Sequence, residues 1–144
     1  MVAAIEEARN CLFNEEVPVG CVIVLDNEII STGSNKCLSK NSPVRHAEIE
    51  AIEFACNILG NYRLPNTSIY VTLEPCHMCS MAIVNARIKN LYFGAKEPKT
   101  GSVVSVDSFF DRDFLNHKVN YSGGYLESES IELLRNFFAN KRKI

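Results

Sequence analysis

Two short motifs constrain this chain more than any other feature. His46 and Glu48 lie in the tripeptide His-Ala-Glu, and Cys76 and Cys79 lie in Pro-Cys-His-Met-Cys. Imidazole and thiolate groups are the ligands that zinc prefers in proteins. A structural zinc site is closed by four protein ligands, whereas a catalytic site uses three and leaves the fourth position for water. His46, Cys76 and Cys79 supply three ligands, so the chain is predicted to fold in a way that brings both motifs to one catalytic Zn²⁺.

Both motifs are expected at the beginnings of helices. Pro75 is suited to a first helical turn, which would place Cys76 and Cys79 on one helix face. The exposed N–H groups and the positive dipole end there favour thiolate over thiol. His46 precedes a run in which apolar residues recur at helical spacing, namely Ile49, Ile52, Ala55, Cys56 and Leu59. The sequence therefore predicts that two helix N-termini meet at one metal ion.

Glu48 is predicted to be a catalytic residue and not a ligand. On a helix its side chain would point about 200° around the axis from that of His46. Zinc lowers the pKa of a bound water to about 7, and a nearby glutamate can take the proton and pass it to a leaving group. A lone Cys-x-x-Cys would favour structural zinc or a redox pair. Combined with His-x-Glu and the proline, it is the pattern of zinc-dependent nucleobase deaminases.

The remaining sequence resembles the bacterial tRNA-specific adenosine deaminases from about residue 3 to residue 142. The resemblance rests on His46-Ala47-Glu48 and on residues 17–20 (Val-Pro-Val-Gly), Asn35, 61–64 (Asn-Tyr-Arg-Leu), 70–76 (Tyr-Val-Thr-Leu-Glu-Pro-Cys), 93–95 (Phe-Gly-Ala), 99–101 (Lys-Thr-Gly) and 116–117 (Asn-His). It implies hydrolysis of adenosine to inosine at the wobble position of a tRNA anticodon loop, one catalytic Zn²⁺ per chain, and a homodimer. It also implies the cytidine-deaminase-like fold.

Length and composition agree with one compact soluble domain over residues 1–144. The chain is 47% hydrophobic, yet it has no apolar run near the roughly 18 residues that would span a bilayer. It also has no N-terminal basic-then-apolar signal, so a cytoplasmic location is expected. Two of the six cysteines belong to the zinc motif. The other four follow no regular spacing, which does not favour a disulfide framework.

The pattern of elements predicts an α/β fold. Residues 2–14 and about 126–140 are expected to be helices, and residues 20–25 and 28–32 to be strands joined by a tight turn at Asp26-Asn27. Buried strands are expected at 69–73 and 90–93, each after a helix-sized stretch, which suits parallel crossovers. This order predicts a three-layer α/β/α domain with a mixed sheet. The resemblance implies the five-stranded form.

Several substrate-binding residues are implied by the resemblance. Asn35 matches an asparagine that hydrogen-bonds the purine, although an asparagine here could also satisfy its own turn. Val19 and Leu73 match apolar positions that line the pocket, although either could be ordinary core. The backbone N–H groups of Ala47 and Cys76 are candidates for stabilising the oxygen of the tetrahedral intermediate.

Contacts with RNA are expected from a basic rim, because the chain as a whole carries a net charge of −2. The candidates are Lys36, Lys40, Arg45, Lys96, Lys99 and the terminal run Lys141-Arg142-Lys143, with Phe138 available to cover a base or pack the last helix. His117 is a candidate for meeting RNA, with a solvent or capping role as the alternative. A terminal cluster of basic residues is often only a solvated chain end, so whether it can contact RNA depends on where it lies in the fold.

Three parts of the chain depart from the family pattern. Val44-Arg45 stands where the family generally has a small pair, and Glu97 stands where it commonly has aspartate. We expect the longer carboxylate of Glu97 to reach the ribose hydroxyl that the aspartate contacts. His77, inside the Cys-x-x-Cys spacer, is predicted to be a histidine of the helix surface, because a fourth protein ligand would close the catalytic position.

Three other functions are compatible with the zinc motif. One is a deaminase of a free base or nucleotide such as guanine, cytosine or deoxycytidylate. Another is an inactive partner subunit, which the presence of Glu48 argues against. The third is an RNA-binding module whose zinc only stabilises the fold.

Overall fold

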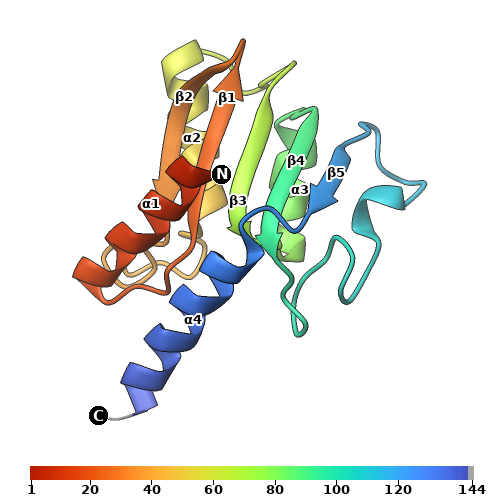
Figure 1. Ribbon diagram of the computed structural model, residues 1–144. Coiled ribbons are helices and arrows are strands. Elements are labelled where there is room, and N and C mark those ends of the chain that lie inside the picture. The colour runs from red at the N-terminus through yellow and green to blue at the C-terminus, as the bar shows by residue number, and fades with distance from the viewer. Residues whose placement is uncertain (143–144) are drawn as a thin grey trace.

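The computed structural model describes residues 1–142, which are organised around one five-stranded mixed sheet (Figure 1). The strands lie in the order β2-β1-β3-β4-β5. The elements are α1 (Val2–Asn10), β1 (Gly20–Leu25), β2 (Glu28–Ser34), α2 (Ala47–Leu59), β3 (Ser68–Leu73), α3 (His77–Asn85), β4 (Asn90–Ala95), β5 (Asn120–Gly123) and α4 (Glu127–Arg142), with the 3₁₀ turns η1 (Cys11–Asn14) and η2 (Phe109–Asp111). None of the helices in this part of the chain is long and apolar enough to cross a membrane.

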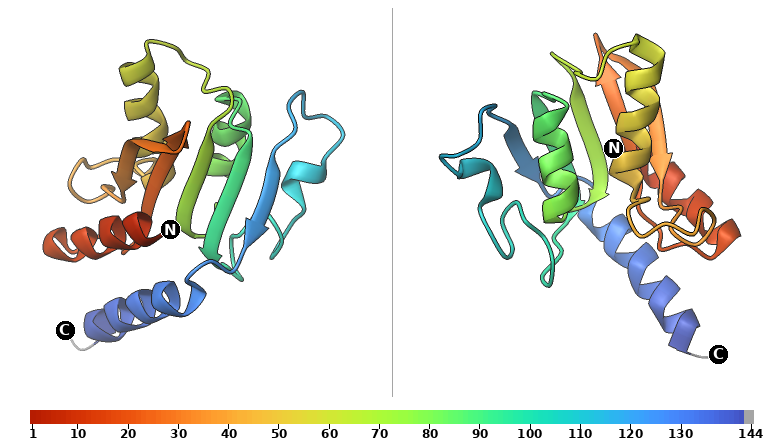
Figure 2. Two further views of the ribbon diagram at one scale, coloured as in Figure 1. Left: turned by 45° about the horizontal axis from the view of Figure 1, so that its top comes forward. Right: turned by 180° about the vertical axis from the view of Figure 1, so that it is seen from behind.

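Helices cover both faces of the sheet. α2 and α3 pack side by side on one face, and α1 and α4 lie on the other (Figures 1 and 2). The predicted three-layer α/β/α arrangement with a mixed five-stranded sheet is therefore confirmed.

The strand directions follow from the connections between them. Asp26 and Asn27 both have positive φ, at 52° and 65°, the left-handed conformation that a two-residue hairpin turn needs. This predicted turn makes β1 and β2 antiparallel, and β1 is also antiparallel to β3. β3, β4 and β5 are parallel, with α3 as the crossover between β3 and β4. The expected parallel crossover is confirmed.

Two helix boundaries differ from the sequence-based predictions. The opening helix ends at Asn10 and continues only as the 3₁₀ turn η1, not as one helix to residue 14. Pro75 lies outside α3, because Cys76 is the N-cap of this helix with an extended backbone (φ −76°, ψ 175°). His46 is likewise the extended N-cap of α2. The prediction that both motifs mark helix starts was right. The first ligand of each motif, His46 or Cys76, nevertheless lies just before the first helical residue.

Close packing of α2 against β2 fixes where His46 lies. Gly33 of β2 faces the start of α2, and a Cβ there would collide with the backbone carbonyl of Ala47. The absence of a side chain lets the helix approach the sheet. Because β3 and β4 are parallel, their carboxyl ends at Leu73 and Ala95 reach the same edge of the sheet. The N-termini of α2 and α3 therefore converge beside this edge.

Candidate active site

The site is a cavity of about 570 Å³ at the carboxyl ends of β3 and β4. Both zinc motifs open into it, and a segment of α4 closes one side. Its walls include nine residues of particular interest, namely Glu16, Val19, Asn35, His46, Glu48, Leu73, Glu74, Cys76 and Glu97. Crevices at the carboxyl ends of parallel strands are where open α/β sheets bind ligands.

The three predicted zinc ligands come together as a compact set. The Nδ1 atom of His46 lies 3.7 Å from Cys76 Sγ and 3.5 Å from Cys79 Sγ. All three donor atoms lie within 4.8 Å of one another. Around a tetrahedral zinc ion, nitrogen and sulfur ligands stand about 3.5–3.8 Å apart. The donor set therefore fits one zinc ion with little movement, and it identifies Nδ1 as the ligating atom of His46.

The electrostatics of the cluster favour a bound cation. The hydrogen bond from the Cys79 thiol lowers the pKa of Cys76 to about 4, with a further contribution from His46. A hydrogen bond to Cys76 raises the pKa of Cys79 above its ordinary value. A hydrogen bond to Cys76 also raises the pKa of His46. In the metal-free protein these groups share protons that a zinc ion would replace.

Glu48 lies in the same cavity and is 4% exposed. Burial raises the pKa of its carboxyl to about 7, against smaller opposite effects that include its own N–H and His46. Among residues 1–142, the metal-ligand cluster consists of His46, Cys76 and Cys79, without Glu48. A carboxyl with a pKa near neutrality beside a metal site is suited to proton transfer.

Asn35 has a structural role in addition to its position in the cavity wall. Its Oδ1 accepts a hydrogen bond of 2.9 Å from the N–H of Ala47, the first residue of α2. The Asn35 side chain thereby caps the helix that carries Glu48. Ala47 itself is fully buried. Its N–H already has an acceptor, so the expected role of this N–H in stabilising the tetrahedral oxygen does not agree with the geometry.

The other predicted substrate-binding residues fall into two groups. Val19, Leu73, Glu97 and Phe138 line the cavity. Lys99 and His117 do not line it: Lys99 lies on the exposed loop after β4, where its N–H donates to Glu97 Oε1 at 3.0 Å. The His117 ring bonds the carbonyl of Ile88 at 2.8 Å, near the opposite end of β4.

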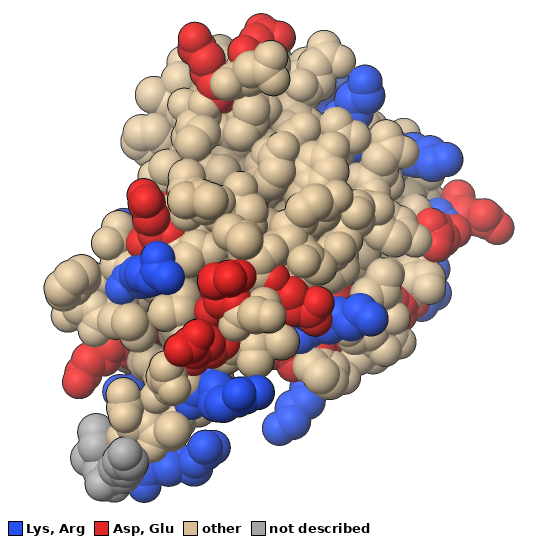
Figure 3. All heavy atoms as spheres, viewed as in Figure 1, with Lys and Arg blue, Asp and Glu red and all other residues tan. Residues whose placement is uncertain are grey.

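The basic residues around the cavity are partly neutralised. Lys40 pairs with Glu50 and Arg45 pairs with Glu53, both on α2. Lys141 lines the cavity from α4, whereas Lys143 lies outside the described residues. Figure 3 shows Lys and Arg side chains interspersed with acidic ones along the lower edge of the molecule, beside α4. The expected basic rim is therefore a mixed one.

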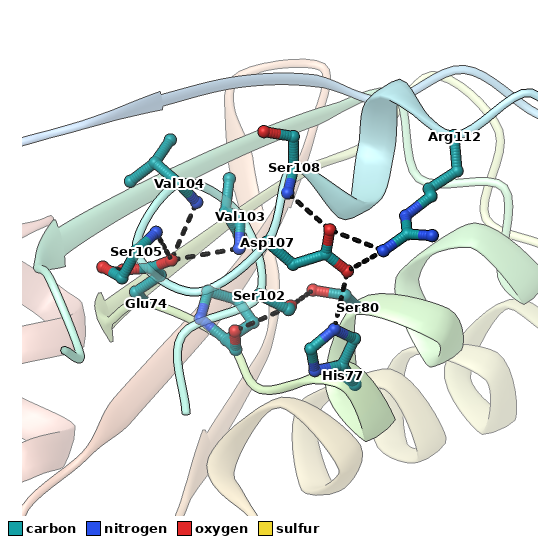
Figure 4. Close-up of polar contacts among 11 residues, drawn as sticks. Glu74, His77, Ser80, Ser102, Val103, Val104, Ser105, Asp107, Ser108 and Arg112 are labelled. Carbon is teal, nitrogen blue, oxygen red and sulfur yellow. Dashed lines mark hydrogen bonds and ion pairs between the residues drawn. The ribbon is translucent and has the colours of Figure 1, made fainter. Parts of the chain in front are cut away.

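His77 does not point to the metal cluster. Its Nε2 lies 2.9 Å from Asp107 Oδ2, and its side chain is half exposed. The prediction of a surface histidine agrees with this position (Figure 4).

One wall residue, Glu74, was not predicted to have any role. Its carboxylate is buried and accepts hydrogen bonds from the loop after β4. The only available signal was its place directly before Pro75-Cys76. The acidic wall residues Glu15 and Glu16 were also missed, and no motif marks them.

The fold and this site, with three ligands and one buried carboxylate, define a zinc-dependent deaminase. The family model that describes the cytidine and deoxycytidylate deaminase zinc-binding region matches residues 1–95. This agrees with the ligand set that the geometry gives.

Similarity to individual proteins shows to which branch of the zinc-dependent deaminases the chain belongs. The tRNA-specific adenosine deaminase of Agrobacterium fabrum is 46% identical over 142 residues, which cover 99% of this chain and 93% of the relative. That of Aquifex aeolicus is 44% identical over 139 residues, covering 96% and 91%. A solved structure from a study of A-to-I editing by tRNA:A34 deaminases superposes with a TM-score of 0.88 at 46% identity, covering 91% of this chain and 95% of that one. The chain belongs to the tRNA-specific adenosine deaminase family.

Proposed function

We propose that this protein converts adenosine to inosine by hydrolysis at the wobble position of a tRNA anticodon stem-loop. The whole chain acts as one domain, as a homodimer in the cytoplasm, with one catalytic Zn²⁺ per chain. The observation that carries the proposal is the buried Glu48 carboxyl beside the His46, Cys76 and Cys79 cluster in one cavity. The likeness of nearly the whole chain to named tRNA-specific adenosine deaminases supports the choice of substrate.

The residues of the cavity divide the chemistry between them. His46, Cys76 and Cys79 would hold the zinc ion, which supplies a water-derived nucleophile near neutral pH. Glu48 takes the two protons of the attacking water in turn and passes one to the purine ring and the other to the departing ammonia. In the metal-free protein burial raises the pKa of the Glu48 carboxyl to about 7, toward the range in which a group gains and loses a proton at little cost near neutral pH. Burial of Glu48 also keeps bulk water away from it.

The purine is held by the walls on either side. Val19 and Leu73 supply apolar surface for the ring. The Oδ1 of Asn35 is committed to Ala47, so its Nδ2 group is the atom that we assign to hydrogen bonding with the base. An amide can serve both purposes at once because it carries donor and acceptor groups.

The shape of the surface supports a substrate larger than a nucleoside. A second hollow of about 310 Å³ lies between the η1 turn and α4 and shares Glu15, Phe137 and Lys141 with the cavity wall. Phe138 is 45% exposed where α4 meets the cavity. Aromatic faces and a lysine suit the bases and phosphates of a single-stranded loop, whose target base is unstacked at lower cost than a duplex base.

Glu97 is proposed to contact the ribose of the target or flanking nucleotide. Its Oε1 accepts the N–H of Lys99 at 3.0 Å, which leaves Oε2 for a ribose hydroxyl. Bound to the stem-loop, Glu97 is expected within hydrogen-bond distance of a ribose. A structure of the complex with this side chain away from every ribose would reject the assignment.

The direct test uses zinc-loaded protein and an anticodon stem-loop with adenosine at the wobble position. Inosine should form in the stem-loop, while free adenosine, guanine, cytosine and cytidine should stay unchanged. Turnover of a small substrate alone would keep the deaminase chemistry and overturn the tRNA assignment. Binding of the stem-loop without ammonia release would instead indicate an RNA-binding module.

A further inference from the structure

A long loop segment grips the turn that carries both cysteines. We call residues 101–112 the strap and residues 74–80 the cysteine turn. The strap follows β4, passes over the end of β3 and runs beside the first turn of α3 (Figure 4). Three separate polar contacts join the two segments, and each engages a different part of the cysteine turn.

The first contact is made by Glu74, two residues before Cys76. Its Oε2 accepts the N–H groups of Val103, Val104 and Ser105 at 2.9–3.0 Å. Its Oε1 accepts the hydroxyl of Ser105 and, at 3.1 Å, the N–H of Glu97. Three successive N–H groups on one carboxylate oxygen form a concave anion site, filled here by the protein's own side chain.

The second contact lies on either side of the cysteines. The hydroxyl of Ser102 donates to the carbonyl of Pro75 at 3.0 Å and lies 2.7 Å from the hydroxyl of Ser80. The N–H of Ser102 also donates to the Pro75 carbonyl, at 2.9 Å. Pro75 precedes Cys76 and Ser80 follows Cys79, and both serines are fully buried. A single strap residue therefore holds the chain before one ligand and after the other.

The third contact lies at the surface, inside the Cys-x-x-Cys spacer. Asp107 of the strap bonds the His77 ring at 2.9 Å, and Arg112 holds the same carboxylate through both oxygens. The ring of Phe109 meets His77 edge-on, with 5.6 Å between ring centroids. The His77 side chain therefore points away from the metal cluster and into the strap.

We propose that the strap is a brace that fixes Cys76 and Cys79 in ligating geometry, with Glu74 and Ser102 as its main positioning residues. The inference rests on the zinc site of the proposed function. Cys76 is an N-cap with no side-chain cap bond, and it precedes the regular helix. Its sulfur is therefore oriented by backbone that the strap holds. Partners that orient metal ligands typically change metal affinity by 10- to 100-fold when they are removed.

The test measures zinc affinity by competition with a chromophoric chelator, together with the absorption spectrum of the Co²⁺-substituted protein. Glu74→Gln keeps the side-chain volume but directs an amide NH₂ at N–H donors. Ser102→Ala removes only one buried hydroxyl and its two contacts. Val104→Ala is the matched control, because it lies in the strap but keeps every backbone bond and trims a half-exposed side chain. Circular dichroism of each metal-free variant establishes that it is folded.

We expect Glu74→Gln and Ser102→Ala to weaken zinc binding about 10- to 100-fold and to shift the cobalt–thiolate charge-transfer bands, with Val104→Ala unchanged. Zinc affinity and cobalt bands equal to those of the wild type in the folded variants would overturn the proposal. Should Glu74→Gln fail to fold, Ser102→Ala decides alone, because it leaves the backbone and the carboxylate in place. A wild-type protein that binds no zinc would instead contradict the proposed function.

Discussion

Glu48 and Glu74 are both buried glutamates in the wall of one cavity, but their chemistry is opposite. They are 4% and 3% exposed. Burial raises the pKa of Glu48 to about 7. Burial acts on Glu74 in the same direction, yet the hydrogen bonds from Ser105, Val104 and Glu97 outweigh it and hold the pKa of this carboxyl below its ordinary value.

The difference lies in the number of donors. The carboxylate of Glu74 accepts bonds from Glu97 N, Val103 N, Val104 N, Ser105 N and Ser105 Oγ. Glu48 lacks such a set of donors, and its burial keeps the pKa of its carboxyl above the ordinary value. Hydrogen bonding to the charged form favours ionisation, and desolvation opposes it. A buried glutamate that must move protons therefore needs few partners, and one that must anchor a loop needs many.

The largest expected effect comes from removing the proton-transfer group. Glu48→Gln should lower the deamination rate on the stem-loop by roughly 10²- to 10⁴-fold, the usual contribution of a general acid–base group. Zinc content, measured by atomic absorption, should stay near one ion per chain because Glu48 is not a ligand. Normal turnover in the metal-replete variant would remove Glu48 from the mechanism.

Cys76→Ser tests the other half of the site. Replacing a thiolate ligand by a hydroxyl should weaken zinc binding by more than the 10- to 100-fold typical of outer partners, because the hydroxyl is a poor zinc ligand. The chelator competition described for the strap measures this loss. Unchanged zinc affinity would contradict the assignment of Cys76 as a ligand.

Glu74→Gln should act on stability, where Glu48→Gln should not. A side-chain NH₂ in the cradle leaves at least two donors without an acceptor, and an unmet hydrogen bond to a charged group costs roughly 1.5–3 kcal/mol. We expect the free energy of unfolding of the metal-free protein to fall by about 3 kcal/mol, measured by urea titration. The same measurement on Glu48→Gln is the control, and a stability loss of equal size there would erase the distinction between the two residues.

The stability that Glu74 provides should depend on pH. Its folded pKa lies below the ordinary value of 4.5, so between the two values the unfolded chain binds more protons. The contribution is thus complete above about pH 4.5 and is lost as pH falls through the folded pKa. The difference in unfolding free energy between the wild type and Glu74→Gln should therefore be constant near neutral pH and narrow as the pH falls below about 4.5. A difference that widens toward acid would mean that the carboxylate is not stabilised by its donors.

The contrast between the two glutamates also marks how far the sequence could predict the site. Residue chemistry identified His46, Glu48, Cys76 and Cys79, because few side chains bind zinc and their spacing is distinctive. The hairpin turn and the parallel strands followed from local patterns. The role of Glu74 did not, because its donors come from residues about 30 positions later and from backbone groups that every residue type carries. Nor could the sequence reveal that the Ala47 N–H would be taken by Asn35.

A third buried glutamate, Glu16, is expected to give the smallest effect. It has fewer hydrogen-bond donors than Glu74, and it therefore tests whether the number of donors sets the contribution of a buried carboxylate. Glu16 is 3% exposed and lies in the same cavity wall. Its carboxylate accepts the N–H groups of Leu38 and Ser39 at 3.1 and 2.8 Å and the Ser39 hydroxyl at 2.8 Å. These bonds hold its pKa below the ordinary value against the opposing effect of burial.

With three donors where Glu74 has five, Glu16→Gln should lower the unfolding free energy by about 1–2 kcal/mol. Ser39→Ala, which removes one of these donors and keeps the carboxylate, should cost less than that. Both are measured by urea titration of the metal-free protein. A loss at Glu16 as large as that at Glu74 would show that burial alone, and not the number of donors, sets the contribution of a carboxylate in this cavity.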